Sequence, residues 1–131
     1  MAAETRAPGE PPDPALTTSV EELGTARVIR VAGEIDMSNV SELESAIEQA
    51  EAVAPERAVI VIDLRKVTFL GAESMRCLVS AHDRIAETGR SMRVVAPPGS
   101  GAVRRLLDLS GVGALLDLFE TVESALPPDN G

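Results

Sequence analysis

Side chains that bind metals or stack on nucleic acids are scarce in this sequence: it has one His, one Cys, two Phe, and neither Trp nor Tyr. A single His82 and a single Cys77 cannot supply the four ligands of a structural zinc site. A lone cysteine cannot form an internal disulfide either, so the fold does not depend on oxidation. The composition therefore predicts no metal, no disulfide and no cofactor, and it suits a reducing cytoplasm.

Basic residues are also few, with 12 Lys and Arg against 21 Asp and Glu, which gives a formal net charge of −9. An acidic chain with so few aromatic residues lacks the phosphate-neutralising surface and the stacking groups that nucleic-acid binding needs. No segment approaches the roughly 18 consecutive apolar residues of a membrane span, and the N-terminus does not resemble a signal peptide. We expect a cytoplasmic protein with no direct nucleic-acid contact and no membrane insertion.

The length of 131 residues and the hydrophobic fraction of 44% indicate one domain with a real core. Residues 1–15 are rich in proline and contain no apolar run, which predicts a disordered tail. A proline pair and Asp-Asn-Gly occupy residues 127–131, which we interpret as a short C-terminal tail. The folded unit is expected to span residues 16–126.

Hydrophobic periodicity predicts alternating elements in the order β-β-α-β-α-β-α-β-α. Such alternation indicates an α/β domain in which the later strands are mainly parallel. Asn39 is expected to cap the first helix, with Glu42 at the spacing of a reciprocal capping box. The apolar, β-branched run at 58–64 predicts a central strand covered on both faces. The other strands are expected at 16–23, 26–32, 91–95 and 115–119, and the later helices from 72 to Gly89, around 103–107, and at 121–126.

Four motifs lie along this element pattern: Gly-Glu-Ile-Asp at 33–36, the strand ending in Asp-Leu at 63–64, Val-Thr-Phe-Leu-Gly-Ala-Glu-Ser-Met at 67–75, and Ala-Val-Arg-Arg-Leu-Leu-Asp-Leu-Ser-Gly at 102–111. In order and spacing they resemble the STAS domain family, and in particular its stand-alone bacterial anti-sigma factor antagonists. The resemblance covers nearly all of residues 16–126. It implies an open mixed β-sheet with helices layered on it.

In that family a kinase-type anti-sigma factor phosphorylates a serine in the loop between the strand and the helix, and the phosphate breaks the complex. The family's loop reads Asp-Ser-Ser-Gly, whereas aligned residues 71–74 read Gly-Ala-Glu-Ser. The phosphoacceptor position is therefore Ala72, which has no hydroxyl. The resemblance implies a protein that lacks the usual phosphorylation switch at this position.

Three hypotheses fit this altered loop. The chain could bind its partner without control at Ala72, Glu73 could supply a standing negative charge in place of phosphate, or Ser74 could be the modified residue. A simpler interpretation makes Glu73 an ordinary first-turn acid that complements the helix dipole, and Ser74 a residue near the helix cap. The resemblance predicts a partner-binding surface made of Asp36, Gly71, Ala72, Glu73, Ser74 and Arg76.

The function that the resemblance implies is non-enzymatic: the chain binds and sequesters a kinase-type anti-sigma factor and frees a sigma factor. One alternative is a STAS-type accessory subunit of a membrane transport ATPase complex. A more remote alternative is a nucleotide-binding or nucleotide-hydrolysing domain, although the chain has no P-loop. Cys77 is interpreted as a half-buried, inert thiol, with redox regulation as the alternative because Arg76 is its neighbour.

Overall fold

The computed structural model describes residues 15–99 and 101–128, so most of both predicted tails lies outside the described residues. The described chain follows the predicted order of strands and helices, with one additional 3₁₀ helix, η2. The strands are β1 (Leu16–Leu23), β2 (Ala26–Ile35), β3 (Val59–Leu70), β4 (Ser91–Val95) and β5 (Leu118–Phe119). The helices are α1 (Val40–Val53), α2 (Ala72–Glu87), α3 (Ala102–Ser110), η2 (Val112–Leu115) and α4 (Val122–Ala125).

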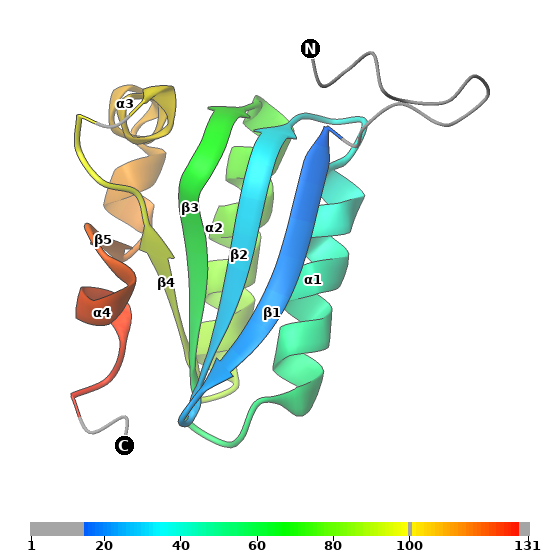
Figure 1. The fold of residues 1–131 in the computed structure, drawn as a ribbon, viewed down its shortest axis with the longest axis vertical. Coiled ribbons are helices and arrows are strands. Elements are labelled where there is room, and N and C mark those ends of the chain that lie inside the picture. The colour runs from blue at the N-terminus through cyan, green and yellow to red at the C-terminus, as the bar shows by residue number, and fades with distance from the viewer. Residues whose placement is uncertain (1–14, 100, 129–131) are drawn as a thin grey trace, which may run out of the picture.

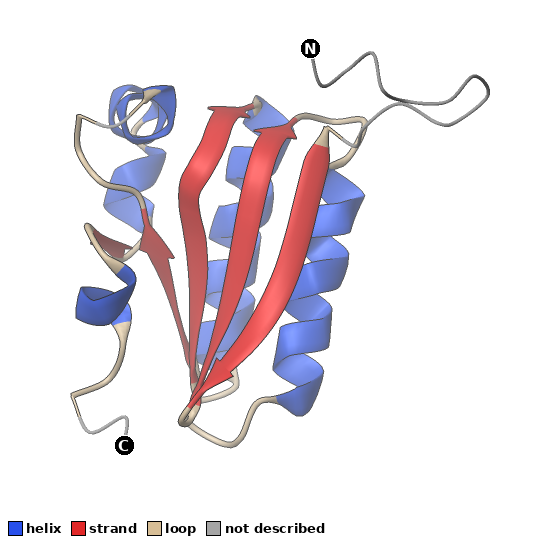
Figure 2. Ribbon diagram, viewed as in Figure 1, coloured by secondary structure: helices blue, strands red, loops and turns tan. Residues whose placement is uncertain are grey.

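The five strands form one mixed sheet in the order β1-β2-β3-β4-β5 (Figure 2). β1 and β2 form an antiparallel hairpin, with Gly24 at a φ of 61° in its turn. The pairs β2–β3, β3–β4 and β4–β5 are parallel, as the alternation of strands and helices predicted. The expected α/β domain with an open mixed sheet is therefore confirmed.

One face of the sheet, here called the inner face, carries α1 and α2 side by side (Figure 1). Both helices bury an apolar stripe at helical spacing against alternate residues of β2 and β3. The residues of this main core with no exposed surface include Ile29, Ile35, Leu43, Ile60, Ile62, Leu78, Ile85 and Leu107.

The opposite, outer face is covered only in part. The short helix α4 packs over a smaller cluster, made of Ala26, Val28, Val59, Val61, Val95, Val122 and Ala125. Beyond that cluster β3 presents Asp63, whose carboxylate accepts hydrogen bonds from Arg65 (Nε, 2.9 Å; Nη2, 2.8 Å) and Arg30 (Nη1, 3.0 Å). Residues 59–62 of β3 are thus apolar on both faces, as predicted, and residue 63 begins a charged stretch.

Glycine is required at one point of the Gly-Glu-Ile-Asp motif. Gly33 has a φ of +113°, and a Cβ built on it would lie 2.0 Å from the carbonyl oxygen of Ala15. The next residue, Glu34, donates its N–H to that same carbonyl over 2.9 Å. The motif's glycine therefore lets the start of β1 cross close to the end of β2.

Three strands differ in extent from the prediction. β2 and β3 extend to Ile35 and Leu70, because two register shifts let their ladder continue, with Ala32 paired to Lys66 and Ile35 paired to Leu70. The strand expected at 115–119 is reduced to Leu118–Phe119, since β4 offers only its last two residues, Val94 and Val95, as partners. The stretch before it forms η2 instead.

Candidate functional site

The candidate site lies at the carboxyl edge of two neighbouring parallel strands. β2 ends at Ile35 and β3 ends at Leu70, and these two residues are paired in the ladder. The N–H of Gly71 donates to the carbonyl of Ile35 over 2.8 Å, which places Asp36 and the start of α2 next to each other. In open α/β sheets such a carboxyl edge is where ligands and partners commonly bind.

Asp36 stands in the turn that leads from β2 into α1. One carboxylate oxygen, Oδ1, accepts from the hydroxyl of Ser38 at 2.6 Å and from its N–H at 2.9 Å. These hydrogen bonds, with that to the Ser38 side chain the strongest, hold the pKa of Asp36 below its ordinary value. The carboxylate is exposed and ionised at neutral pH, so a partner meets a fixed negative charge here.

The predicted capping box at the start of α1 is wrong. The side chain of Asn39 is buried and makes no capping bond to the helix. Its amide instead accepts from the N–H of Asp36 (3.0 Å) and donates to the carbonyl of Glu34 (2.9 Å). Glu42 makes only a backbone hydrogen bond to Asn39. The Asn39 side chain therefore braces the turn that carries Asp36 rather than the helix end.

Ser74 does not lie on the surface. The structure buries it completely, and its hydroxyl donates to the carbonyl of Ile35 over 3.0 Å. That carbonyl also accepts the Gly71 N–H, so two bonds tie the first turn of α2 to the end of β2. The expectation that Ser74 forms part of the exposed docking surface is therefore wrong, because tertiary contacts enclose its side chain.

The other residues expected at the site are brought together, and Gly71 is half-buried between them. Asp36, Ala72, Glu73 and Arg76 are exposed. Glu73 and Arg76 form an ion pair one turn apart on α2, with much of both side chains in solvent. An exposed pair of this kind contributes little to stability, so both groups remain available to a partner.

Two exposed apolar side chains beside the site were missed from the sequence. Met37 is 75% exposed in the turn after β2, and Phe69 is 46% exposed near the end of β3. Phe69 also lies close to Gly71, where a Cβ would meet its ring at 3.6 Å. The only sign of Met37 and Phe69 in the sequence is that each is an apolar residue outside the predicted strands. The exposed set is here called the edge surface, and consists of Asp36, Met37, Phe69, Ala72, Glu73 and Arg76.

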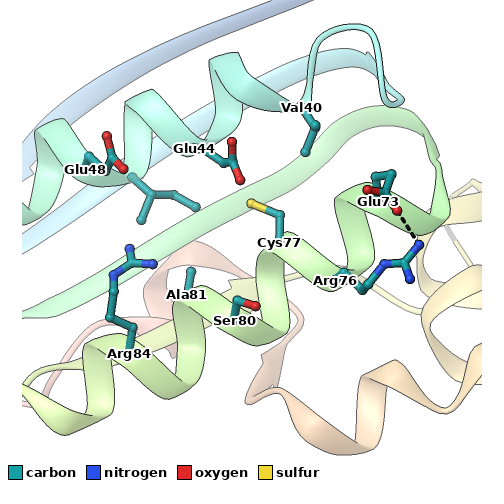
Figure 3. A pocket seen from close by; sticks show the side chains of 10 residues that line it. Val40, Glu44, Glu48, Glu73, Arg76, Cys77, Ser80, Ala81 and Arg84 are labelled. Carbon is teal, nitrogen blue, oxygen red and sulfur yellow. Dashed lines mark hydrogen bonds and ion pairs between the residues drawn. The ribbon is translucent and has the colours of Figure 1, made fainter.

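A groove of about 310 Å³ separates α1 from α2 (Figure 3). Glu44 and Glu48 project into it from α1, and Cys77 and Arg84 from α2. Burial, and then the negative charge of Glu44, raise the pKa of the Cys77 thiol to about 11. A thiol with that pKa stays protonated at neutral pH and is a weak nucleophile, which supports its interpretation as inert.

The other flank of α2 carries the only histidine. His82 is partly buried, and its Nδ1 and Nε2 lie 3.3 Å from carboxylate oxygens of Asp83 and Asp117, respectively. These three residues do not form a metal site, and no group of three such ligands occurs elsewhere in residues 15–99 and 101–128. No helix in the described part of the chain is long and apolar enough to cross a membrane.

Comparison with known proteins agrees with this architecture. The STAS domain model matches residues 17–125. The chain is 33% identical over 115 residues to the anti-sigma-F factor antagonist RsfB of Mycobacterium tuberculosis, covering 88% of this chain and 89% of RsfB. It is 28% identical over 112 residues to RsfA of the same species, also named an anti-sigma-F factor antagonist, with 86% of both chains covered.

A solved structure extends the likeness to three dimensions. The crystal structure of an anti-sigma factor antagonist from Mycobacterium paratuberculosis superposes with a TM-score of 0.72 at 33% identity, covering 84% of this chain and 90% of that one. The match of the family model over the whole folded unit, together with these relatives, shows that the chain belongs to the STAS domain family.

Proposed function

We propose that this protein is an anti-sigma factor antagonist, which binds an anti-sigma factor in the cytoplasm and so frees a sigma factor for transcription. The relatives that carry this name align over most of both chains, which supports the proposal. The observation that carries it is the edge surface itself, where Ala72 is exposed at the start of α2, next to Glu73 in the chain and after Gly71, which lies close to Asp36.

The proposed protein acts by binding and not by catalysis. Its edge surface combines exposed apolar groups, Met37 and Phe69, with charges of both signs, Asp36 and Arg76. This mixture is typical of protein–protein interfaces. The pKa of the Cys77 thiol, about 11, makes this cysteine a poor nucleophile. We therefore propose no enzymatic activity and no cofactor.

The partner is proposed to be a kinase-type anti-sigma factor that this chain binds without being phosphorylated. Ala72 offers a methyl group where the family offers a hydroxyl. The hydroxyl of Ser74 is buried and donates to Ile35, so a kinase would have to unwind the start of α2 to reach it. Glu73 forms an ion pair with Arg76, and the positive charge of Arg76 offsets the negative charge by which Glu73 would imitate phosphate.

The test uses the purified chain and the purified anti-sigma factors of the source bacterium, taken one at a time. Isothermal titration measures binding, and intact mass after incubation with ATP detects phosphate. The variant Ala72→Ser restores the missing hydroxyl at an exposed position. The variant Ala86→Ser is the matched control, since it adds a serine at another exposed position of α2.

We expect the wild-type chain and Ala86→Ser to bind one anti-sigma factor and to gain no phosphate. Ala72→Ser should gain one phosphate and then bind about tenfold or more weakly, because the added charge lies inside the interface. Phosphate on Ser74 of the wild-type chain would contradict the proposal that the chain binds its partner without being phosphorylated. A pull-down from the source bacterium that recovers a transport ATPase and no anti-sigma factor would contradict the antagonist function.

A further inference from the structure

A second groove runs along the other flank of α2, on the side away from α1. Its volume is about 420 Å³. Arg76 and Ser80 are its only polar lining residues. The rest of the lining is apolar, and consists of Ala72, Met75 and Val79 from α2 and Val112 and Leu115 from η2. This set of residues is here called the apolar groove.

The apolar groove differs from a small-molecule site. Such sites combine an apolar lining with several convergent polar groups that orient the ligand. Here Leu115 is 58% exposed and Met75 is half-buried, so apolar surface faces solvent directly. The groove therefore suits apolar side chains presented by another protein.

Two exposed carboxylates, those of Asp83 and Asp117, lie outside the groove's lining but a short distance along the chain from it. His82 follows Val79 by one turn of α2, and Asp117 follows Leu115 by two residues. The carboxylates of Asp83 and Asp117 lie on either side of the His82 ring, and these two side chains are 72% and 60% exposed. A basic side chain placed beside the apolar contacts would meet both carboxylates.

We propose that the apolar groove receives an amphipathic helix of the anti-sigma factor. Two apolar side chains one turn apart fill the groove, and a Lys or Arg of the same helix lies against Asp83 and Asp117. The groove is continuous with the edge surface, because Ala72 and Arg76 belong to both. The inference rests on the proposed function and adds a second contact to the edge surface.

The first test compares two exposed leucines close together in the chain. Leu115 lines the apolar groove, whereas Leu109 of α3 is 76% exposed and does not line it. Isothermal titration with the anti-sigma factor that binds the wild-type chain should show affinity reduced about tenfold or more for Leu115→Asp, since a buried leucine contact is replaced by a charge. Leu109→Asp should bind within about twofold of the wild type, because its side chain stays in solvent.

A second measurement needs no substitution. Methionine methyl resonances report three places in the described chain: Met75 in the apolar groove, Met37 on the edge surface and Met92 in the core. Addition of the same anti-sigma factor should shift or broaden the Met75 signal and leave the Met92 signal in place. Circular dichroism on Leu115→Asp, and the milder variant Leu115→Ala, exclude loss of folding as the cause of weaker binding.

The outcomes separate the two proposals. Binding by the wild-type chain that is unchanged in Leu115→Asp, or that shifts Met37 but not Met75, overturns the apolar groove and leaves the antagonist function standing. Equal losses for Leu115→Asp and Leu109→Asp also overturn it. Failure of the wild-type chain to bind any anti-sigma factor overturns the proposed function, and the groove proposal with it.

Discussion

The two faces of the sheet are stabilised in different ways, although the same strands build both. On the inner face, Ile60 and Ile62 of β3 are buried beneath α1 and α2 in one continuous apolar core. On the outer face, Val59 and Val61 belong to a smaller cluster covered by the short helix α4, and the next outward residue is Asp63 with its arginine partners. A single strand thus changes from apolar to ionic packing on one side only.

This difference determines where a binding site can be held rigidly. The edge surface and the apolar groove both depend on α2, which the inner core fixes along its length through Leu78 and Ile85. Among residues 15–99 and 101–128 the outer face carries no long helix, and its ion pairs hold the strands together without reaching the site. We therefore expect inner-face changes to disturb stability and binding together, and outer-face changes to affect stability alone.

The largest effect is expected from truncating two neighbouring residues of β3 whose side chains lie on opposite faces of the sheet. Ile62→Ala removes a fully buried side chain from the inner core and should lower the free energy of unfolding by about 4 kcal/mol. Val61→Ala removes a smaller buried side chain beneath α4, and about 2 kcal/mol is expected. Urea denaturation measures the free energy of unfolding of both variants. Equal losses would show that the two faces contribute similarly to stability.

The alternation of faces could be predicted from the sequence, because periodicity is local. The run at 58–64 identified the central strand, and the order of elements identified the parallel pairs β2–β3 and β3–β4. The interpretation of Ala72 as the family's phosphoacceptor position rests on the motif around it and stays a prediction. These features depend on a few adjacent residues, which is why they could be predicted.

The site could be predicted only in part, because its details depend on contacts between distant segments. Ser74 is buried where its hydroxyl donates a hydrogen bond to the carbonyl of Ile35, which is 39 residues away in the chain. Asn39 has a good capping sequence, but its side chain binds Glu34 and Asp36 instead. The apolar groove was not predicted at all, since residues 112–115 were not expected to form a helical turn next to α2.

The second test concerns the ionic patch on the outer face. Asp63→Asn removes the charge that Arg30 and Arg65 share, and should lower the free energy of unfolding by about 2 kcal/mol at pH 7. Glu21→Gln is the control, because Glu21 contacts the same Arg30 from an exposed position and should cost under about 0.5 kcal/mol. Binding of the anti-sigma factor should be unchanged in both variants.

The effect of Asp63→Asn should depend on pH with a definite sign. Burial alone would raise the pKa of Asp63, but the hydrogen bonds and charges of Arg65 and Arg30 outweigh it and lower the pKa below 3.8. A carboxyl whose pKa is lowered by folding contributes stability above its unfolded pKa, and that contribution is lost as pH falls through its folded pKa. The gap between wild type and variant should therefore be full above about pH 5 and shrink in stronger acid. A gap that widens in acid would contradict the ionic interpretation.

Apart from the control variants, the smallest effect on stability should be at Ser74, where the inner face meets the site. Ser74→Ala removes the hydrogen bond to Ile35 and should cost about 1 kcal/mol, while Ser80→Ala, at an exposed position of α2, should cost almost nothing. The loss at Ser74 should also speed amide exchange at Gly71, whose N–H binds the same carbonyl, because the first turn of α2 then separates more easily from β2. Hydrogen exchange followed by nuclear magnetic resonance measures this directly. Faster exchange at Gly71 with little change in the core strands would show that this one hydroxyl holds the edge surface to the inner face; uniform exchange would assign Ser74 to the general core instead.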